Sequence, residues 1–323
     1  MMRRPLGTAL VALVVLAAGA LLAGGVRPRR ALPATSAPAA AAPASPASAV
    51  PAPVASPTVP HRDVQTQPNA FFDGAQFGLG LRAGRAHPAP ALTGTLVGGL
   101  VPHHILASTL LATFWQQLEA QPPHTVIVVG PNHPARGQRI ITGRRGWATD
   151  FGVVEADNRL IDALVATGLV TVDDETLSEE HSEGAEMPYI KYHAPQATVV
   201  PLILHKDVKP EELARLIDVL APHLGKDCIL VASMDFSHYL TRVEAEAKDP
   251  ESLAAIRSHD LATLWAMGPD HLDSPPSVGM LLLAMQRLGL EQPEILGHTN
   301  SGYILQNDAT ETTSYFVFRY QRP

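Results

Sequence analysis

The sequence contains little cysteine, little charge and few aromatic residues. Its single cysteine, Cys228, excludes an internal disulfide framework and a thiolate metal cluster. The formal net charge of −7, from 24 basic and 31 acidic residues, argues against nucleic acid as a partner, because phosphate contacts need clustered lysine and arginine. A Gly-x-Ser-x-Gly elbow, a Walker loop and a Gly-x-Gly-x-x-Gly turn after a strand are also missing. Serine-hydrolase, nucleotide-binding and nucleic-acid-binding functions therefore fit the chain poorly.

Polar residues are almost absent from Leu6–Val26, a run of Ala, Val, Leu and Gly that follows Arg3 and Arg4. About twenty apolar residues can span a bilayer as a helix, and a basic start before an apolar core is also the pattern of a secretory signal. The run is long for a signal core, which favours an uncleaved membrane anchor with an extracytoplasmic domain over a secreted protein. We therefore expect attachment to a membrane through residues 1–30.

A second compositional change separates this segment from the rest of the chain. Residues 31–60 are dominated by Ala, Pro, Ser and Val, with almost no charge and no periodicity. Prolines favour extended, solvated chain, so we expect this stretch to be a linker. The remaining residues, 61–323, are numerous enough for one large domain with an ample core.

In this domain, strand patterns alternate with helix patterns. Thr125–Val129 is a β-branched run without alternation, which is typical of a strand buried on both faces of a parallel sheet. Thr93–Val101, Ala197–Leu204 and Cys228–Ala232 are further predicted strands. The alternation predicts an α/β fold, a three-layer sandwich with a mainly parallel central sheet.

The predicted helices each carry one apolar face. Ile105–Ala120, Asp157–Thr167 and Pro210–Leu224 have their large aliphatic residues at helical spacing. Residues 147–154 are predicted to be turn-rich, and Pro201 predicts an edge position or a bulge for its strand. The rest of the chain adds predicted helices over 244–258, 260–267 and 277–288, and predicted strands over 294–299 and 314–320.

Polar side chains follow several strands at the points where they end. His103 and His133 follow two strands, and Asp235 with His238 follows a third, while Glu180–His181 lies on a segment between them. In open α/β sheets, ligands bind in the crevice beyond the carboxyl ends of the strands. Imidazoles with a carboxylate form non-haem Fe(II) sites, and the same groups serve in acid–base chemistry. The sequence therefore predicts a site here, which either binds a metal or moves protons without one.

Six short motifs, in this order, resemble those of the MEMO family, whose bacterial and archaeal members are called AmmeMemoRadiSam system protein B. They are VPHH at Val101–His104, VVGPNHP at Val128–Pro134, EEHSEGAEMPYI at Glu179–Ile190, VPLIL at Val200–Leu204, SMDFSHYL at Ser233–Leu240 and NSGY at Asn300–Tyr303. The resemblance covers essentially the whole predicted domain. The family resembles class III extradiol dioxygenases in fold, which implies a central sheet flanked by helices and a metal site at one edge.

The resemblance also implies roles for individual residues. His103 and His133 match the first two histidines of the family pattern, which implies that they bind a metal. His181 matches the histidine of the family's EHS motif, and Asp235 and His238 match its D-x-S-H motif. These three residues are expected to form a catalytic acid–base group that orients ligands and moves protons.

Three positions depart from the family pattern. The Ala-Gly-Tyr that follows the first family histidine is His104–Leu106 here, so a tyrosine is lost and a second histidine appears. The family glutamate after the EHS motif falls on Gly184, with Glu183 and Glu186 beside it. The family's metal-site cysteine is absent, and Asp273 falls at or near its position, which would give two histidines and a carboxylate. Asp273 equally suits a helix N-cap.

The resemblance implies a MEMO-like protein with one Fe(II) or copper ion held by His103, His133 and Asp273. The expected activity is redox or dioxygenase-like chemistry on a small molecule. Two other functions stay open: a metal-dependent hydrolase that uses the same histidines, and a non-catalytic module that binds a peptide or another ligand. The lost cysteine and the altered first motif make the second of these a serious alternative.

Overall fold

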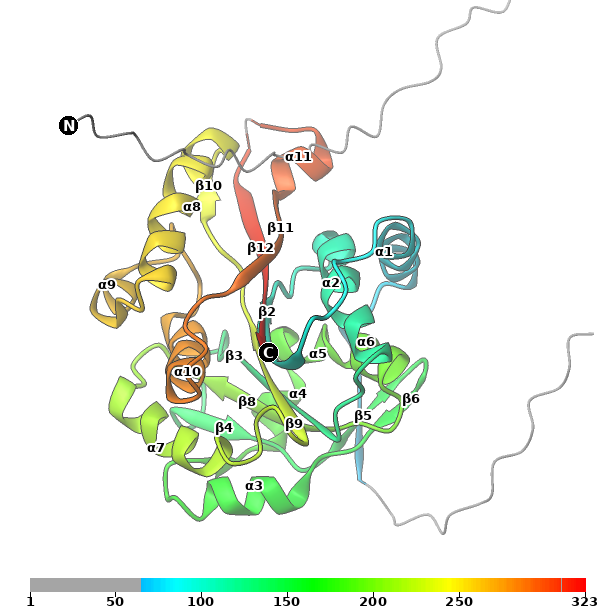
Figure 1. Ribbon diagram of the computed structural model, residues 1–323, viewed down its shortest axis with the longest axis vertical. Helices are drawn as coiled ribbons and strands as arrows, with labels where there is room; N and C mark the ends of the chain where they lie inside the picture. The colour runs from blue at the N-terminus through cyan, green and yellow to red at the C-terminus, as the bar shows by residue number, and fades with distance from the viewer. Residues whose placement is uncertain (1–64, 309) are drawn as a thin grey trace, which may run out of the picture. The chain divides into compact units, whose positions relative to one another are not determined.

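The β-branched run that the sequence singles out is the middle strand of a large sheet. The computed structural model describes residues 65–308 and 310–323 (Figure 1). In it β3 (Thr125–Pro131) lies between β8 (Thr198–Leu204) and β9 (Cys228–Ser233) and is parallel to both. Every residue of β3 is buried, as predicted for a strand covered on both faces.

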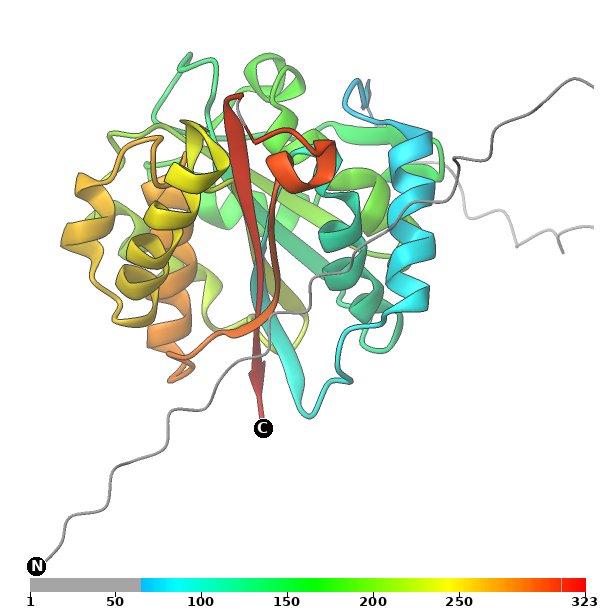
Figure 2. The same cartoon turned by 90° about the horizontal axis from the view of Figure 1, so that it is seen from above.

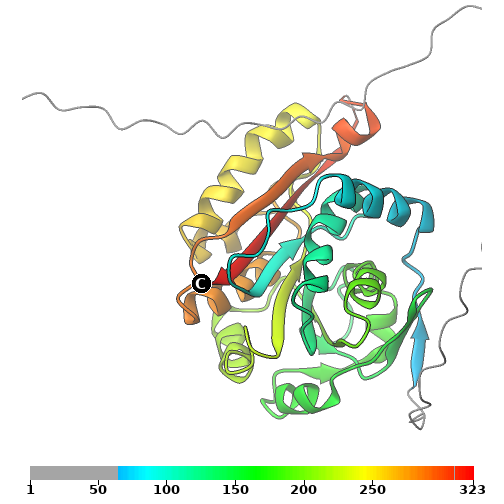
Figure 3. The same ribbon diagram turned by 45° about the vertical axis from the view of Figure 1, so that its right-hand side comes forward.

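The sheet has nine strands in the described part of the chain. Its order is β10-β12-β2-β9-β3-β8-β4-β7, and β11 pairs with β12. The four central strands, from β2 to β8, are parallel, whereas antiparallel pairs join β2 to β12 and β8 to β4. The remaining bounds are β2 (Thr95–Val101), β4 (Ile140–Thr142), β7 (Thr171–Val172), β10 (His238–Leu240), β11 (Glu294–Asn300) and β12 (Thr312–Arg322). Figure 3 shows the long β11–β12 pair.

Helices cover both faces of this sheet, which gives the predicted three-layer α/β sandwich. Figure 2 shows α1 and α2 on one side of the sheet, and α8 to α10 on the other. The first layer contains α1 (Gly74–Ala86), α2 (Ser108–Trp115) and α6 (Met187–His193). The second contains α3 (Asn158–Val165), α7 (Pro210–Leu220), α8 (Arg242–Arg257), α9 (Leu261–Ala266) and α10 (Pro275–Arg287). The other helices of the described residues are short: α4 (Asp174–Ser178), α5 (His181–Gly184), α11 (Ser301–Leu305) and the 3-10 helices η1 (Ile105–Ala107) and η2 (Gln116–Glu119).

Alternate side chains of β3 supply two separate cores. Val126 and Val128 belong to the core that also contains Phe114 of α2. Ile127 and Val129 belong to the core that contains the apolar faces of α7 and α10. Because side chains point to opposite faces in a strand, a continuous apolar run is what a sheet between two helical layers requires.

The prediction that Pro201 marks an edge or a bulge is wrong. β8 is an interior strand, and Pro201 lies opposite Val128 in an unbroken register with β3. β4 pairs only with Ile203 and Leu204, so no ladder bond is needed from residue 201 on that side. The carbonyl of Pro201 instead accepts a hydrogen bond from the Thr142 hydroxyl at 2.8 Å. Proline is tolerated here because β4 is too short to pair with residue 201, so the missing N–H of Pro201 costs no hydrogen bond to that strand.

The turn-rich segment contains a hairpin that the sequence analysis missed. β5 (Gly146–Thr149) and β6 (Gly152–Val154) are antiparallel, and β1 (Thr66–Pro68) adds to β5 to form a small second sheet. Their strands are only three or four residues long, so no alternating pattern could identify them.

α10 begins at a different cap from the one that the sequence allowed. Ser274 is its N-cap, and the Ser274 hydroxyl accepts a hydrogen bond from the Ser277 N–H. Asp273 is therefore not the cap of this helix, and its side chain is available to the site described below.

The predicted anchor and linker lie outside the described residues. Within residues 65–308 and 310–323, none of the helices combines the length and the apolar character needed to cross a bilayer. Cys228 is buried at the start of β9, as expected for a core residue.

Candidate metal centre

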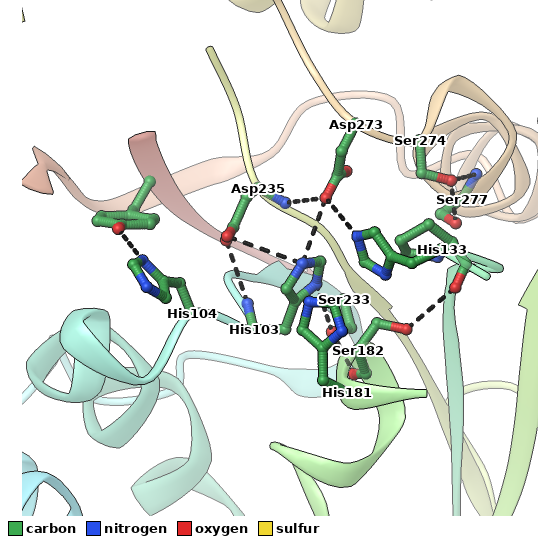
Figure 4. Close-up of polar contacts among 12 residues, drawn as sticks. His103, His104, His133, His181, Ser182, Ser233, Asp235, Asp273, Ser274 and Ser277 are labelled. Atoms are coloured by element: carbon green, nitrogen blue, oxygen red, sulfur yellow. Dashed lines mark hydrogen bonds and ion pairs between the residues drawn. The ribbon is translucent and has the colours of Figure 1, made fainter. Parts of the chain in front are cut away.

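Three neighbouring parallel strands deliver polar side chains to one edge of the sheet. His103 follows β2 by two residues, His133 follows β3 by two, and Asp235 follows β9 by two. Since β9 lies between β2 and β3, the three ends are adjacent in space. His181, at the start of α5, and Asp273, just before α10, reach the same place (Figure 4). The structure thus brings together the residues that the sequence proposed for a site.

His103 is the most deeply buried of the histidines, with 3 % of its surface exposed. Its Nε2 lies 3.3 Å from Oδ2 of Asp273 and 3.7 Å from Oδ2 of Asp235. On the other side of the ring, Nδ1 lies 3.4 Å from the Ser233 hydroxyl. Burial lowers the pKa of His103 well below its ordinary value, and the neighbouring His133 lowers it further. The ring is therefore neutral at physiological pH, which is the form that binds metals.

His133 is held by a fully buried carboxylate. Oε2 of Glu180 accepts the backbone N–H of His133 at 2.8 Å, and Oε1 lies 2.7 Å from Nδ1 of the ring. Burial alone would raise the pKa of Glu180, but these hydrogen bonds outweigh it and leave the pKa lowered. An ionised Glu180 fixes the proton of His133 on Nδ1, so that Nε2 faces Asp273 at 3.8 Å with its lone pair free.

His181 completes a cluster of three imidazoles. One ring nitrogen of each of His103, His133 and His181 lies within 4.8 Å of those of the other two. The rings of His133 and His181 are stacked, with centroids 4.1 Å apart, while His103 is roughly perpendicular to both. Burial lowers the pKa of His181, and His133 adds to the effect. Three imidazoles so close together fit a metal ion, because the neutral form of each ring offers a lone pair.

Two aspartates, Asp235 and Asp273, flank the cluster and are joined to each other by two hydrogen bonds. The N–H of Asp235 donates to Oδ2 of Asp273 at 3.2 Å, and the N–H of Asp273 donates to the carbonyl of Asp235 at 3.1 Å. Oδ1 of Asp235 accepts the backbone N–H of His103 at 3.2 Å. Burial raises the pKa of Asp235 to about 7, and burial together with the charge of Asp235 raises the pKa of Asp273 well above its usual range. A cation between them and the histidines would offset this cost of burying carboxylates.

The spacing of these groups suits one ion. Two ligands about 2.1 Å from a tetrahedral metal are separated by about 3.4 Å, close to the distances from Asp273 to His103 and His133. Two imidazoles bound to one ion have ring centroids about 4.6–5.3 Å apart. The His103–His133 and His103–His181 pairs lie in this range, whereas the centroids of the stacked His133–His181 pair are closer together. The donors present therefore fit either two histidines with Asp273 or three histidines, and His181 must swing away from His133 to join them.

His238, the third residue of the expected acid–base group, lies at the start of β10. It is half-buried, and its Nδ1 has no hydrogen-bond partner among the described residues. Burial lowers its pKa to about 4, with His133 and His104 contributing. These electrostatic partners indicate that it lies near the histidine cluster, and the lowered pKa keeps the ring neutral but makes it a weaker base.

The glutamate that the family pattern has at position 184 has no room here. A Cβ on Gly184 would lie 2.5 Å from the Phe71 ring and 3.1 Å from the Asn69 side chain. Glu183 and Glu186, which the sequence suggested as substitutes, are both fully buried. Glu186 has two side-chain partners, Trp115 at 2.7 Å and Ser233 at 3.2 Å, whereas neither oxygen of Glu183 has a hydrogen-bond partner among the side chains of residues 65–308 and 310–323.

Ser233 and Tyr315 are supporting residues that the sequence did not identify, and it named Glu186 only as a substitute for a family glutamate. Ser233 and Glu186 lie behind His103, and Tyr315 makes a short hydrogen-bond contact with Nδ1 of His104, the extra histidine of the first motif. Ser233 is the last residue of β9, and Tyr315 lies within β12. A polar residue that ends a buried strand next to a proposed ligand is a signal that could have identified Ser233.

Comparisons with known proteins show the family to which the chain is similar. Residues 84–316 match the model of a family described as Memo-like protein. A MEMO1 family protein of Pyrobaculum aerophilum is 27% identical over 228 residues, which cover 68% of this chain and 81% of the relative. A MEMO1 family protein of Methanopyrus kandleri is 28% identical over 239 residues, which cover 71% and 84%. Among solved structures, an uncharacterized protein of Escherichia coli K12 is similar over 69% of this chain and 99% of its own, with 16% identity and a TM-score of 0.45.

Proposed function

Since this chain belongs to the Memo-like family, we propose that it binds one transition-metal ion at the histidine cluster and uses it in redox chemistry on a small molecule. The observation that carries the proposal is the convergence of His103, His133 and His181, whose ring nitrogens lie within 4.8 Å of one another. Neutral imidazoles at the carboxyl edge of an α/β sheet are both good ligands and well placed for a bound molecule.

In this proposal His103 and His133 bind through Nε2, and Asp273 supplies the third ligand. Two histidines and a carboxylate leave positions open on the metal and are the ligand set typical of Fe(II) oxygenases. Copper is the second candidate, because His181 can add a third imidazole. Such an ion, when bound, would supply one-electron chemistry and open positions for a substrate.

The residues around the ligands would orient the substrate and move its protons. His181 has 42% of its side chain exposed and can accept a proton from a hydroxyl of the bound molecule at the open side of the cluster. The Nδ1 of His238 is buried and its pKa of about 4 makes the ring a weaker base, so His181 is the better placed of the two for this role. Asp235, which accepts the backbone N–H of His103, orients that ligand rather than meeting the substrate.

A zinc-dependent hydrolase is the second candidate, and one observation favours it. Three histidines with an open fourth position are a catalytic zinc site in other enzymes, where the metal activates water at neutral pH. Here two of the three rings, His133 and His181, are 32% and 42% exposed, so water can reach them. The two functions differ in the metal that binds and in whether oxygen is consumed.

The first test is metal loading of the full chain, purified without a histidine tag. The protein would be reconstituted without oxygen with Fe(II), copper or zinc, washed, and its metal content measured beside His133→Ala and Asp273→Ala, with His87→Ala as an exposed control. One equivalent of iron or copper that both site variants lose, with oxygen uptake on addition of a substrate panel, supports the proposal. Zinc alone with hydrolytic turnover supports the hydrolase.

Absence of any bound metal in the wild type would contradict both enzymes and favour a module that binds a small molecule or a peptide. Loss of metal in His133→Ala but not in Asp273→Ala would remove Asp273 from the ligand set and leave the three histidines. The control at His87 is exposed and lies in the cap of α1, so it should keep the full metal content.

We also propose that the apolar run at Leu6–Val26 attaches the domain to a membrane on its extracytoplasmic side. The run length and the arginines before it support this placement. Fractionation of cells that produce the full chain tests it. Recovery in the membrane fraction after an alkaline wash is expected, and recovery of a shortened protein outside the cell would indicate cleavage instead.

A further inference from the structure

A cavity of about 540 Å³ lies at the end of the sheet opposite the histidine cluster. His124, just before β3, and Thr198, the first residue of β8, both line it. His133 follows the other end of β3, and the seven residues of this strand put about 20 Å between its two ends. The cavity is therefore separate from the candidate metal centre, and its volume is in the range of small-molecule sites in proteins.

The lining of this cavity is polar almost throughout. Of the ten residues that form it, Ala156 alone is apolar. The side chains of Gln65, Asn158 and Thr198 can exchange hydrogen bonds with hydroxyl groups. A lipid tail or an aromatic ring would find almost no apolar surface to cover it, so the lining suits a molecule with a hydroxyl-rich body.

Three arginines bring positive charge to the cavity from two parts of the chain. Arg144 and Arg145 lie in the turn between β4 and β5, and Arg159 lies in the first turn of α3. Asp174 holds the turn in place, because one of its carboxylate oxygens accepts the backbone N–H of Arg144 at 2.6 Å and that of Arg145 at 3.0 Å. The two guanidinium groups therefore extend from a fixed stretch of backbone.

These guanidinium groups can turn toward a ligand at little cost. Arg144 pairs with Asp162 at 2.5 Å and Arg145 pairs with Glu175 at 2.7 Å, and the two acids are 66% and 80% exposed. Ion pairs at such exposed positions contribute little to stability. Arg159 pairs with no carboxylate in the part of the chain that the structure describes, so its guanidinium is available to an anion.

Two acids also line the cavity, but they leave it positively charged. Asp157 is 9% exposed and its oxygens are directed into the fold, where they accept the Thr125 hydroxyl at 2.7 Å and the Leu160 N–H at 3.1 Å. Glu155 is exposed and can accept a hydroxyl group of a ligand. Three arginines and two acids give the lining a net charge of +1.

We propose that this cavity binds a phosphorylated polyol, such as a sugar phosphate. Arg144, Arg145 and Arg159 hold the phosphate, because a guanidinium presents parallel N–H donors that match two phosphate oxygens. The polar side chains of the lining bind the hydroxyl groups of the polyol. The molecule is a second ligand of the protein rather than the substrate of the metal centre, and the inference does not depend on the proposed function.

Isothermal titration of the full-length protein with ribose 5-phosphate tests the proposal. Metal is first removed with a chelator, because an ion in the histidine cluster could itself bind phosphate. Ribose and inorganic phosphate, each titrated separately at the same ionic strength, represent the two halves of the probe.

Four variants locate the binding. Arg145→Gln and Arg159→Gln each remove one guanidinium from the cavity. Arg287→Gln is the matched control, since Arg287 is a 64% exposed arginine at the end of α10, outside the cavity lining. His133→Ala reports any binding at the histidine cluster. Thermal unfolding checks that each variant is folded.

We expect ribose 5-phosphate to bind more tightly than ribose or inorganic phosphate alone. Arg145→Gln and Arg159→Gln should each weaken its binding by about tenfold, because each loses a charge-assisted hydrogen bond. Arg287→Gln and His133→Ala should bind it as the wild type does.

The inference is overturned if the wild type does not bind ribose 5-phosphate or binds inorganic phosphate equally well. It is also overturned if the affinity is unchanged in Arg145→Gln or Arg159→Gln, if Arg287→Gln weakens binding as much as they do, or if His133→Ala abolishes binding. Metal content does not enter any of these outcomes, so a failure of the proposed metal-binding function would leave this inference standing.

Discussion

Glu180 holds His133 at two points, since Oε2 accepts its backbone N–H at 2.8 Å and Oε1 lies 2.7 Å from its Nδ1. Oε1 also accepts the N–H of Ser182 at 2.9 Å, which makes Glu180 the cap of α5. One buried carboxylate thus fixes the ring of His133 and the helix that carries His181. Glu180 and His181 are a polar pair in the sequence, but nothing in the sequence shows that the side chain of Glu180 would bind His133.

Glu180→Gln is expected to weaken metal binding by about tenfold to a hundredfold. A glutamine can accept at one oxygen only, and its amide would oppose either the N–H of His133 or the N–H of Ser182. Zn²⁺ affinity measured by chelator competition checks this. Glu179→Gln is the control, because Glu179 is exposed and pairs with Arg136 at the surface. Equal losses in the two variants would contradict the role given to Glu180.

Asp273→Asn is expected to weaken metal binding by at least about tenfold, because the amide removes an anionic ligand that faces both His103 and His133. Asp270→Asn, three residues earlier and half-exposed in its ion pair with Lys248, should bind metal normally. Isothermal titration with Zn²⁺ and Fe(II) measures both. Normal affinity in Asp273→Asn would assign the third ligand to His181.

The contribution of His238 to the stability of the metal-free protein should fall as the pH is lowered from 6.5 toward 4, while the raised pKa values of the buried Asp235 and Asp273 act in the opposite direction. Burial lowers the pKa of His238 from 6.5 to about 4, so the unfolded chain binds a proton in this window that the folded protein does not. The full effect of such a shift is at most about 3 kcal/mol. His103 and His181 act in the same direction.

Urea unfolding at several pH values between 4 and 7 checks this prediction. As the pH is lowered, the wild type should lose stability relative to His238→Gln, whereas its difference in stability from His87→Gln, at an exposed position, should not change with pH. A difference between the wild type and His238→Gln that stays constant over this window would show that burial does not hold His238 neutral.

Gly279→Ala is expected to destabilise the domain by about 1–3 kcal/mol. A Cβ at this position of α10 would lie 2.1 Å from Cη2 of Trp265 in α9. The Trp265 ring cannot simply move away, because its indole N–H donates to the carbonyl of Val208 at 2.9 Å. Thermal unfolding measures the change. Gly78→Ala in α1 is the control, since its Cβ meets only the end of the Arg82 side chain and should be neutral or stabilising.

The sequence predicted the strands and helices whose apolar residues follow a clear pattern. β3, β8 and β9 were identified from buried apolar runs, and α7 from its apolar face, its proline start and its acidic first turn. α1 was missed because four glycines give it little helical propensity. One of them, Gly80, is needed for packing, since a Cβ there would lie 2.3 Å from the Ser108 carbonyl oxygen of α2.

In the candidate site, too, some residues could be placed from the sequence and others could not. The strand ends placed His103, His133 and Asp235 at one edge, because adjacent parallel strands must end together. The position of Asp273 depended on a match in a loop, and the structure places it 3.3 Å from His103. The buried partner Ser233 follows no periodic pattern, and the sequence named Glu186 only as a substitute for a family glutamate. The contact between the two depends on the packing of α5 and α6 against β9.

The most direct test of the account is X-ray absorption spectroscopy at the metal edge of the full-length protein loaded with one equivalent of Fe(II) or Zn²⁺. We expect nitrogen and oxygen neighbours at about 2.1 Å together with the outer-shell scattering of at least two imidazoles. His133→Ala should lose one imidazole or the ion itself. A spectrum without imidazole scattering, or one unchanged in His133→Ala, would contradict a metal centre at this histidine cluster.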